Sequence, residues 1–466
     1  ERVTQPGEIV PAIRRGIQGG YLNLAVTWVV QLLMVPLLLH HLGRDTYGLY
    51  AALTSLVGYF GLLTFGSALT VPRYVADHAA RGDSEALSEF FSTYFALHLA
   101  IGVVGLLIGV GAAPLLEAKL VVPEALRGVV APAWRLVVAG WALGLTAGLF
   151  QSLLTGLGEV HLANPANAAR TAFNLAVAAA VVWSGGDLQR LLLGLLAAGL
   201  LASAALYLFV RARHPEIRVS PARARMVTLR ATGRPAGYYF LMQVAALVVM
   251  GTDNIVIGAF LGVGQVTAYA VAFQLWAITL AILWTGVDAL QPFFTRWDAT
   301  GERDTLREAY LRATKVAFAG AVLAAMLIAV LGQRAIGAWV GRDLAVDRRV
   351  LWVFCGMLLT ATPIHTASLV LAALGKHRPA AIGGAVEAAL NLALSIALVR
   401  PLGVLGVALG TLVSGILTNA WVAPLAAARA LDIPVATYVR RALLPAGLPA
   451  LLGAVLVAAL ARWMIF

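Results

Sequence analysis

One apolar stretch, residues 265–292, carries aromatic and polar side chains at helical spacing. Its members are Tyr269, Phe273, Trp276, Trp284, Asp288 and Gln291. At 100° per residue they share an arc of about 120°. Aromatic rings stack on the C–H faces of sugars, while acids and amides hydrogen-bond hydroxyl groups. The spacing favours a carbohydrate-binding face; the alternative is that the rings pack against neighbouring helices or form an interfacial belt.

Two further apolar stretches carry polar faces. Tyr239, Gln243, Asp253 and Asn254 share one arc, and Asn23, Thr27 and Gln31 follow each other at steps of four. Polar groups are costly against lipid, so we expect them to face protein or water. The candidates for a sugar groove are therefore Asn23, Gln31, Tyr239, Gln243, Tyr269, Phe273, Trp276 and Trp284.

Two acids stand out because they lie in or beside apolar stretches. We interpret Asp253 and Asp288 as candidates for ion coupling or for a gate. For Asp253 the alternative is a structural acid paired with a neighbouring donor. The sequence has no phosphate-binding Gly-x4-Gly-Lys-Ser/Thr loop, no His-Glu-x2-His and no Cys-x2-Cys. We therefore expect no enzyme activity, no cofactor and no metal site.

The composition says what must position these residues. Hydrophobic residues make up 61% of the 466 residues and charged residues 12%, about half the charged share of a soluble protein. Apolar stretches of about twenty residues recur, and each is long enough to cross a bilayer as a helix. Thirteen spans are predicted: 17–40, 47–71, 90–115, 131–156, 166–184, 190–210, 236–260, 265–292, 311–332, 350–374, 380–399, 403–427 and 443–464.

The basic residues are unevenly distributed between the connecting segments. With the N-terminus inside, the inner segments hold 23 Lys and Arg and all other segments hold 11. This bias predicts a cytoplasmic N-terminus. It also accounts for the net charge of +12 without a nucleic-acid partner. The densest group, seven arginines within 211–234, is expected to set topology and to contact anionic phospholipids.

Three loose motifs occur twice in the same order. LGRDTYGLYA at 42 matches LGVGQVTAYA at 261, ARGDSEAL at 80 matches ATGERDTL at 299, and Leu-Gly-x15-Asn-Leu begins at 157 and at 374. The offsets are 219, 219 and 217 residues. This repeat predicts an all-α polytopic membrane protein of two six-helix lobes related by a parallel pseudo-two-fold axis. The expected parts are an N-terminal lobe (1–210), a basic linker (211–234), a C-terminal lobe (235–427) and an amphipathic segment with a further span (428–466), the last giving one or two extra C-terminal helices.

Small residues and charges add two expectations to the repeat. Ridges at Gly140, Gly144 and Gly148, at Gly105 and Gly109, and at Gly406 and Gly410 are expected to pack helices within each lobe. The 217 offset superposes Arg170 on Glu387, a candidate pair between the lobes. The two charges either bond each other or face separate partners.

The stretches TDNIVIGAFLGVGQVTAYAVAFQL, LGRDTYGLYAALTSLVGYFG with RYVADHAARGD, and LAALGKHRPAAIGGAVEAALNL carry a resemblance. They are similar to the multidrug/oligosaccharidyl-lipid/polysaccharide flippase superfamily, in particular to its polysaccharide transporters, the Wzx-like flippases of O-antigen. The resemblance implies a bacterial cytoplasmic-membrane protein that moves an oligosaccharide on undecaprenyl pyrophosphate to the outer leaflet. It implies that spans 17–40, 47–71, 236–260 and 265–292 line a central cleft. A cation-coupled multidrug antiporter and a lipid II-type precursor flippase are the alternatives.

Four arginines lie at the cytoplasmic ends of these cleft-lining spans: Arg15, Arg73, Arg234 and Arg296. Guanidinium groups bind phosphate oxygens in bidentate fashion, so we interpret them as pyrophosphate-binding candidates. Asp288 would pair with one of them when the cleft closes. Expected partners are the lipid-linked oligosaccharide, anionic phospholipids and a glycan polymerase in the membrane, and the transport unit is expected to be a monomer. A scaffold for that polymerase, without transport, is a third hypothesis.

Overall fold

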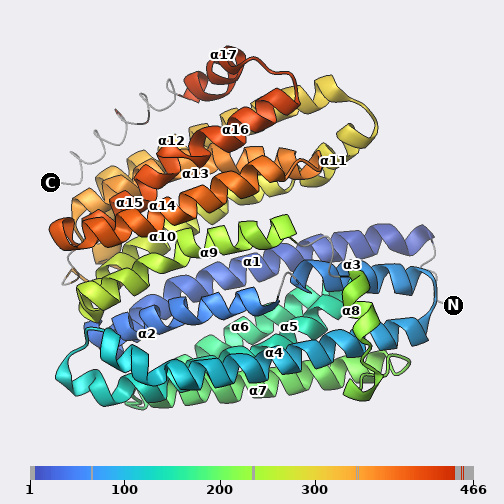
Figure 1. Cartoon of the computed structure of the whole chain (residues 1–466), viewed down its shortest axis with the longest axis horizontal. Helices are drawn as coiled ribbons and strands as arrows, with labels where there is room; N and C mark the ends of the chain where they lie inside the picture. The colour runs from blue at the N-terminus through green and yellow to red at the C-terminus, as the bar shows by residue number, and fades with distance from the viewer. Residues whose placement is uncertain are drawn as a thin grey trace. The chain divides into compact units, whose positions relative to one another are not determined.

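The computed structural model describes residues 6–64, 67–232, 237–342, 344, 346–446, 453 and 455, with the backbone alone at 6–19, 68–69, 230–232 and 237–239. The residues so described contain no strand, which confirms the all-α prediction. The chain divides into two compact units, Glu1–Gly237 (unit 1) and Tyr238–Phe466 (unit 2). In each unit the long helices run side by side (Figure 1).

Unit 1 contains six long segments followed by a short helix. Its helices are α1 (Pro6–Leu42), α2 (Arg44–Gly58), α3 (Ser67–Ala80), α4 (Ser84–Lys119), α5 (Arg127–Gly156), α6 (Val160–Trp183), α7 (Leu188–Arg213) and α8 (Met226–Thr232). Short 3₁₀ turns cover Tyr59–Thr64, Glu124–Leu126 and Pro221–Arg223. The predicted span 47–71 is therefore not one helix, because the α-helix ends at Gly58 and a 3₁₀ turn follows.

Unit 2 has the same plan. Its helices are α9 (Gly237–Phe260), α10 (Val263–Asp288), α11 (Gln291–Ala299), α12 (Arg303–Val340), α13 (Arg348–Ala373), α14 (Arg378–Leu402), α15 (Val404–Leu417), α16 (Asn419–Ala430) and α17 (Val435–Tyr438). A π-helical turn, Val439–Leu443, and a 3₁₀ turn, Leu444–Ala446, follow α17. The predicted span 265–292 is interrupted between Asp288 and Gln291, because Pro292 has no N–H to continue the α10 ladder.

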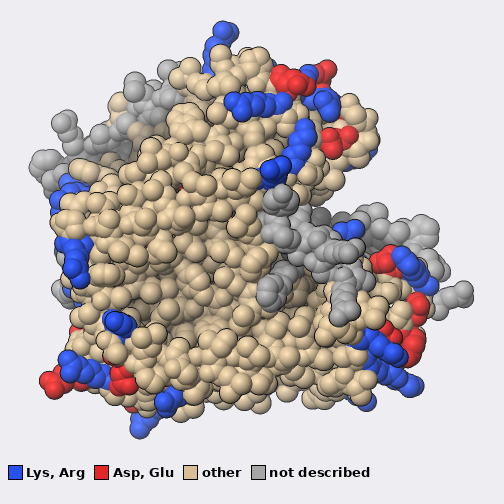
Figure 2. Space-filling model, in the orientation of Figure 1, with Lys and Arg blue, Asp and Glu red and all other residues tan. Residues whose placement is uncertain are grey.

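Eleven described segments are long and apolar enough to cross a membrane. The predicted span 166–184 forms α6, but this helix is not among the eleven, since Asn164, Asn167 and Arg170 lower its hydropathy. It packs along α1 and α7, which places neighbours beside these polar groups. The predicted span 443–464 lies almost wholly outside the described residues. Within each unit, charged side chains gather mainly near the ends of the long helices and are rare along their lengths (Figure 2).

The repeat is confirmed by helix packing inside each unit. In unit 1, α4 packs on α5, and α5 packs on α7. In unit 2, the counterparts α12 and α13 pack together, and α13 packs on α15 and α16. The short helices also correspond, because α3 contacts α4 and α5 as α11 contacts α12 and α13.

Glycines at the helix junctions mark the same repeat. The backbone has positive φ at Gly43 and Gly262, at Gly82 and Gly301, and at Gly158 and Gly375. These are the glycines of the three repeated motifs, and each pair ends or begins equivalent helices. Residues with a Cβ rarely adopt this conformation. The motifs therefore recur because the same turns recur.

The basic segment after α7 is docked on unit 1. Ser88 and Ser92 on α4 accept hydrogen bonds from the backbone N–H groups of Arg218 and Ser220 at 3.0 and 3.1 Å. Arg223 forms an ion pair with Glu85 at 2.7 Å. Between residues 214 and 229 the predicted linker thus contacts α4, and the compact division falls later, after Gly237.

Candidate functional site

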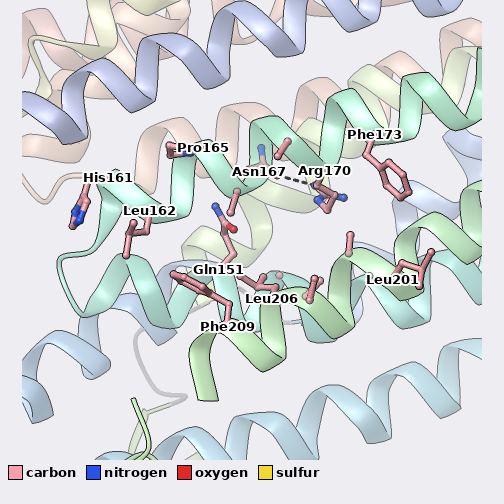
Figure 3. Close-up of a pocket in the computed structure, with 17 residues that line it drawn as sticks. Gln151, His161, Leu162, Pro165, Asn167, Arg170, Phe173, Leu201, Leu206 and Phe209 are labelled. Atoms are coloured by element: carbon pink, nitrogen blue, oxygen red, sulfur yellow. Dashed lines mark hydrogen bonds between the residues drawn. The ribbon is translucent and has the colours of Figure 1, made fainter. Parts of the chain in front are cut away.

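A pocket of about 650 Å³ lies between α5, α6 and α7 of unit 1 (Figure 3). Its wall is mostly apolar: α7 contributes Leu201, Leu206 and Phe209, and α6 contributes Phe173. Gln151, His161, Asn167 and Arg170 supply its polar groups. The described lining includes one Arg and neither Asp nor Glu, so the pocket is suited to an amphiphile with a negative charge.

The polar groups of the pocket form a hydrogen-bonded chain. Arg170 Nη2 donates to Asn167 Oδ1 at 2.8 Å, and Asn167 Nδ2 donates to Asn23 Oδ1 on α1 at 2.9 Å. Gln151 Nε2 donates to the carbonyl oxygen of Ala163 at 2.6 Å. Asn23, a predicted groove residue, therefore orients Asn167, and Asn167 in turn orients the guanidinium of Arg170.

Two glycines of α5 make room for the pocket. Gly144 and Gly148 line it, and no heavy atom lies within 4 Å of the place where a Cβ would stand on either residue. The prediction that this ridge packs helices together is wrong for these two positions, because they face the open volume. It is confirmed on α4, where a Cβ on Gly105 would lie 2.3 Å from Trp141 and one on Gly109 would lie 2.6 Å from Val138.

Unit 2 contains a different kind of site, a buried acid. Asp253 on α9 is 3% exposed, and its Oδ2 accepts hydrogen bonds from the Tyr269 hydroxyl and, at 3.0 Å, from Thr411 Oγ1. Asn391 Nδ2 donates to Thr411 Oγ1 at 2.6 Å. The second carboxyl oxygen of Asp253 and the amide oxygen of Asn391 are buried with no hydrogen-bond partner among the described residues. These oxygens offer a place for a proton or a small cation.

Glu387 lies one helical turn before Asn391 on α14. It is hydrogen-bonded by Asn419 of α16, and its carboxyl lies against Gly415 of α15. Arg170 and Glu387 thus each have a partner inside their own unit. The predicted pairing of one with the other stays a prediction.

The aromatic face of α10 is covered in this conformation. Tyr269 and Trp276 are 1% and 2% exposed. Together with Phe273 they pack around Phe354 of α13, with ring centroids 5.4, 6.0 and 6.2 Å from that of Phe354. In this conformation α13 covers Tyr269 and Trp276, and the half-buried Phe273 belongs to the same cluster, so a sugar groove along these residues stays a prediction. The packing alternative holds for this part of the face.

Toward the C-terminal end of α10 the same face is more open. Trp284 stacks on His365 with ring centroids 4.0 Å apart, and His365 Nε2 lies 2.7 Å from Asp288 Oδ1. The pairing of Asp288 with an arginine when the cleft closes stays a prediction. The ion-pair partner of Asp288 in the structure is His365, since α13 lies beside the end of α10.

The remaining predicted residues divide by what is described. Gln31 is exposed, Gln243 is half-buried, and Arg73 and Arg296 are exposed, with no ion pair to a described residue. Arg15 lies on α1 and Tyr239 on α9, but their side chains lie outside the description. Arg234 lies outside the described residues altogether.

The sequence reasoning missed two sets of functional candidates. Gln151 and Asn167 of the pocket, and Thr411 beside Asp253, lie in otherwise apolar helices. Polarity inside an apolar run was a usable signal for all three. It does not say which helix lies opposite, and that is what brings each of them to a site.

Comparisons with known proteins agree with this architecture. The model of the family described as polysaccharide biosynthesis protein matches residues 19–297, more than half of the chain. The uncharacterized membrane protein EpsK of Bacillus subtilis (strain 168) is 21% identical over 406 residues, which are 85% of this chain and 79% of that protein.

Solved structures share the fold. An inward-facing multidrug resistance MATE family transporter of the MOP superfamily has a TM-score of 0.71 at 15% identity, over 89% of this chain and 98% of the other. A MOP superfamily transporter from Pyrococcus furiosus, described as having a binding pocket of reversed polarity that suggests a different function, has a TM-score of 0.64 at 16% identity, over 90% and 95%. The chain therefore shares the fold of these MOP superfamily transporters, is a multi-pass membrane protein, and belongs to the polysaccharide biosynthesis protein family.

Proposed function

We propose that this protein is a flippase that moves an oligosaccharide linked to undecaprenyl pyrophosphate from the cytoplasmic to the outer leaflet of the bacterial cytoplasmic membrane. Family membership supports a saccharide cargo, and the fold supports membrane transport. Two units of the same helix order suit alternating access, in which two halves move about a substrate path. The proposed orientation, with the N-terminus in the cytoplasm, follows the basic residues of the inner segments.

The observation that carries an anionic cargo is the state of Arg73 and Arg296. They lie on α3 and α11, the short helices that follow the breaks in the second helical segment of each unit. Both are exposed and have no ion pair with a described residue, whereas Arg81 pairs with Asp77 and Arg312 pairs with Glu308. Unpaired guanidinium groups are available for the oxygens of a pyrophosphate. Arg15 and Arg234 belong to the same proposal by their sequence positions.

We propose that Asp253 and the residues hydrogen-bonded around it, Tyr269, Thr411 and Asn391, couple transport to a cation. A carboxylate in a fully buried site needs a proton or a positive partner, because burying an unpaired charge is costly. Asp253 has hydroxyl donors and no cationic side chain as a hydrogen-bond or ion-pair partner among the described residues. The carboxyl and the buried oxygen of Asn391 would hold the cation in one state of the cycle. Asp288, with His365, would act as a gate at the end of α10.

Deletion of the gene in its native host tests the function. A flippase predicts that carrier-linked repeat units accumulate on the cytoplasmic face and that surface glycan is lost. The wild-type gene restores export, and Arg73→Lys and Arg296→Lys insert normally but lose much of it, since Lys lacks the fork geometry. Arg81→Lys and Arg312→Lys are the matched controls and should export normally. Unchanged surface glycan with new drug sensitivity would instead indicate an antiporter. Full glycan export by variants of the candidate groove residues and of Arg73 and Arg296 would indicate a scaffold.

A further inference from the structure

The unit 1 pocket contains a cation for which the described part of the chain provides no anion. Arg170 lies ten residues into α6, about 15 Å of helix rise from Val160. It forms no ion pair with a described residue, and it donates a hydrogen bond to the neutral amide of Asn167. A charge inside a membrane protein is costly unless a counter-charge or water accompanies it. Arg170 is exposed in the open pocket, so a negatively charged occupant can reach it and supply the counter-charge.

The geometry of Arg170 fits a phosphate. A guanidinium has five N–H donors in a planar fork, and Arg170 gives one from Nη2 to Asn167. This hydrogen bond holds the fork on the pocket wall and leaves other donors for an anion. Figure 3 shows Gln151 directed from α5 toward the same part of the pocket as Asn167 and Arg170. Phosphate oxygens accept paired hydrogen bonds from such a fork.

The rest of the wall fits a hydrocarbon chain. Phe173, Leu201 and Phe209 line the pocket and are exposed, and the bare backbone at Gly144 and Gly148 adds width. The volume of 650 Å³ is within the range of small-molecule sites, about 300–1,000 Å³. It would take a phosphate with the first part of an apolar chain, and it is too small for a whole lipid-linked oligosaccharide.

We propose that this pocket binds a lipid phosphate, with Arg170 on the phosphate and the Gly144–Gly148 and Phe209 walls around the adjoining hydrocarbon. Such chemistry is offered by a polyprenyl phosphate or pyrophosphate and by an anionic phospholipid. That the lipid is the carrier of the cargo rests on the proposed function, whereas the binding of a lipid phosphate does not. The pocket is thus a holding site for the lipid part inside unit 1, and neither Arg73 nor Arg296 is among its described lining residues.

The test is direct binding to the full-length protein in detergent, followed by native mass spectrometry. The probes are a polyprenyl phosphate, the matching polyprenol without phosphate, phosphatidylglycerol and inorganic pyrophosphate. We expect the polyprenyl phosphate to bind at least tenfold more tightly than the polyprenol. Arg170→Gln should remove about tenfold or more of that affinity, since hydrogen bonds to charged groups contribute about 1.5–3 kcal/mol and 1.4 kcal/mol is tenfold.

Two further variants separate charge from space. Gly148→Leu fills the pocket without changing charge, and open space exists at its Cβ position, so it should fold and lose lipid binding. Arg190→Gln removes an exposed arginine near the start of α7, outside the pocket lining, and should bind lipid as the wild type does. The melting temperature of each variant shows that it is folded.

Each result decides the proposal. Equal, Arg170-dependent binding of phosphatidylglycerol supports the site and identifies its occupant as a membrane phospholipid. Lipid binding unchanged in both Arg170→Gln and Gly148→Leu overturns the proposal, and so does Arg170-dependent binding of inorganic pyrophosphate alone. Glycan export in the deletion host is measured separately, so loss of the flippase function with intact lipid binding, or the reverse, is recognised.

Discussion

The two units repeat one helix order but differ in what they enclose. Unit 1 has an open pocket between α5, α6 and α7 with Arg170 on its wall. Unit 2 has the buried acid Asp253, and α14 carries Glu387 where the 217 offset places Arg170. Met34 occupies the position in unit 1 that the 219 offset matches to Asp253. The two copies thus share one helix order, and a few side chains give each copy its own chemistry.

Glycines account for much of the difference in packing. In unit 2 a Cβ on Gly406 would lie 2.1 Å from the Leu398 carbonyl oxygen, and one on Gly410 would lie 2.8 Å from the backbone nitrogen of Ser395. Aligning Gly403 with Gly185 puts Leu188 and Leu192 at these positions in unit 1. Small residues let α14 and α15 touch backbone to backbone. Leucines at the equivalent positions of α7 do not allow the same backbone approach to α6.

The largest effect should come from a matched pair of glycine replacements. Gly406→Ala places a Cβ where the Leu398 backbone already lies, so we expect little or no folded protein, since overpacking alone costs about 1–3 kcal/mol and a backbone clash costs more. Gly148→Ala should raise stability by about 0.5–1 kcal/mol, because it lies in a helix with free space. Thermal unfolding of the purified variants measures both. Equal tolerance at the two sites would contradict the packing comparison.

The next effect concerns the acid of unit 2. Asp253→Asn keeps the size of the side chain and removes its charge, so we expect a folded protein whose glycan export falls about tenfold or more, as the loss of 1.4 kcal/mol of cation binding would give. Asp347→Asn is the control, because this exposed acid pairs with Arg349 between α12 and α13. Export and its dependence on sodium and pH are measured in the deletion host. Normal, ion-independent export by Asp253→Asn would make the acid structural.

A charge exchange sharpens the comparison at the superposed pair. We expect Arg170→Glu and Glu387→Arg each to reduce export severalfold, and the double variant to be no better than the worse single one. The reason is that each residue has its partner in its own unit, Asn167 for Arg170 and Asn419 for Glu387. Export by complemented cells is the readout. Restoration in the double variant would support a bond between the two units instead.

The smallest effect concerns the ion pairs of Glu159 in unit 1. Glu159, before α6, accepts from Arg213 at 2.8 Å and lies 3.0 Å from His214, whereas its repeat counterpart in unit 2 is Lys376. Burial favours the neutral acid, but the hydrogen bonds from His214 and Arg213 outweigh it and hold the pKa of the Glu159 carboxyl below 4.5. A lowered pKa stabilises the fold above the ordinary value, and this contribution is lost as the pH falls through the folded-state pKa.

Glu159→Gln should therefore cost less than about 1 kcal/mol at neutral pH, as partly exposed ion pairs do. The stability difference from wild type should vanish when the pH falls well below 4.5. Melting temperatures of both proteins between neutral and acid pH measure it. A difference that stays constant with pH would assign the effect to packing and not to the charge.

The order of helices and the turns between them could be predicted from the sequence, because both depend on local signals. Apolar runs gave the helices, and glycines such as Gly43 and Gly262 gave equivalent turns, since only glycine adopts positive φ freely. The acid Asp253 was also recognisable, as a charge inside an apolar run. Helix breaks after Gly58 and Asp288 were missed because hydropathy does not resolve a turn within a long apolar segment.

The surroundings of each side chain were less predictable. A helical arc shows that Tyr269, Phe273 and Trp276 share a face, but Phe354, which covers them, lies on another helix much later in the chain. The partners of Asp253, Thr411 and Tyr269, come from two different helices for the same reason. The pocket depends on where α6 and α7 separate, which is a property of tertiary packing and leaves little trace in local sequence.

Reconstitution tests the central claim of lipid-linked oligosaccharide translocation most directly. Vesicles carry a labelled undecaprenyl-pyrophosphate oligosaccharide, and a membrane-impermeant glycosidase reports the share that is accessible from outside. We expect the wild-type protein to make nearly the whole pool accessible, and Arg73→Ala and Asp253→Asn vesicles to stay close to the protein-free share while Arg81→Ala vesicles behave as wild type. Accessibility equal to that of protein-free vesicles, in protein shown to be folded and supplied with sodium or proton gradients, would contradict the account.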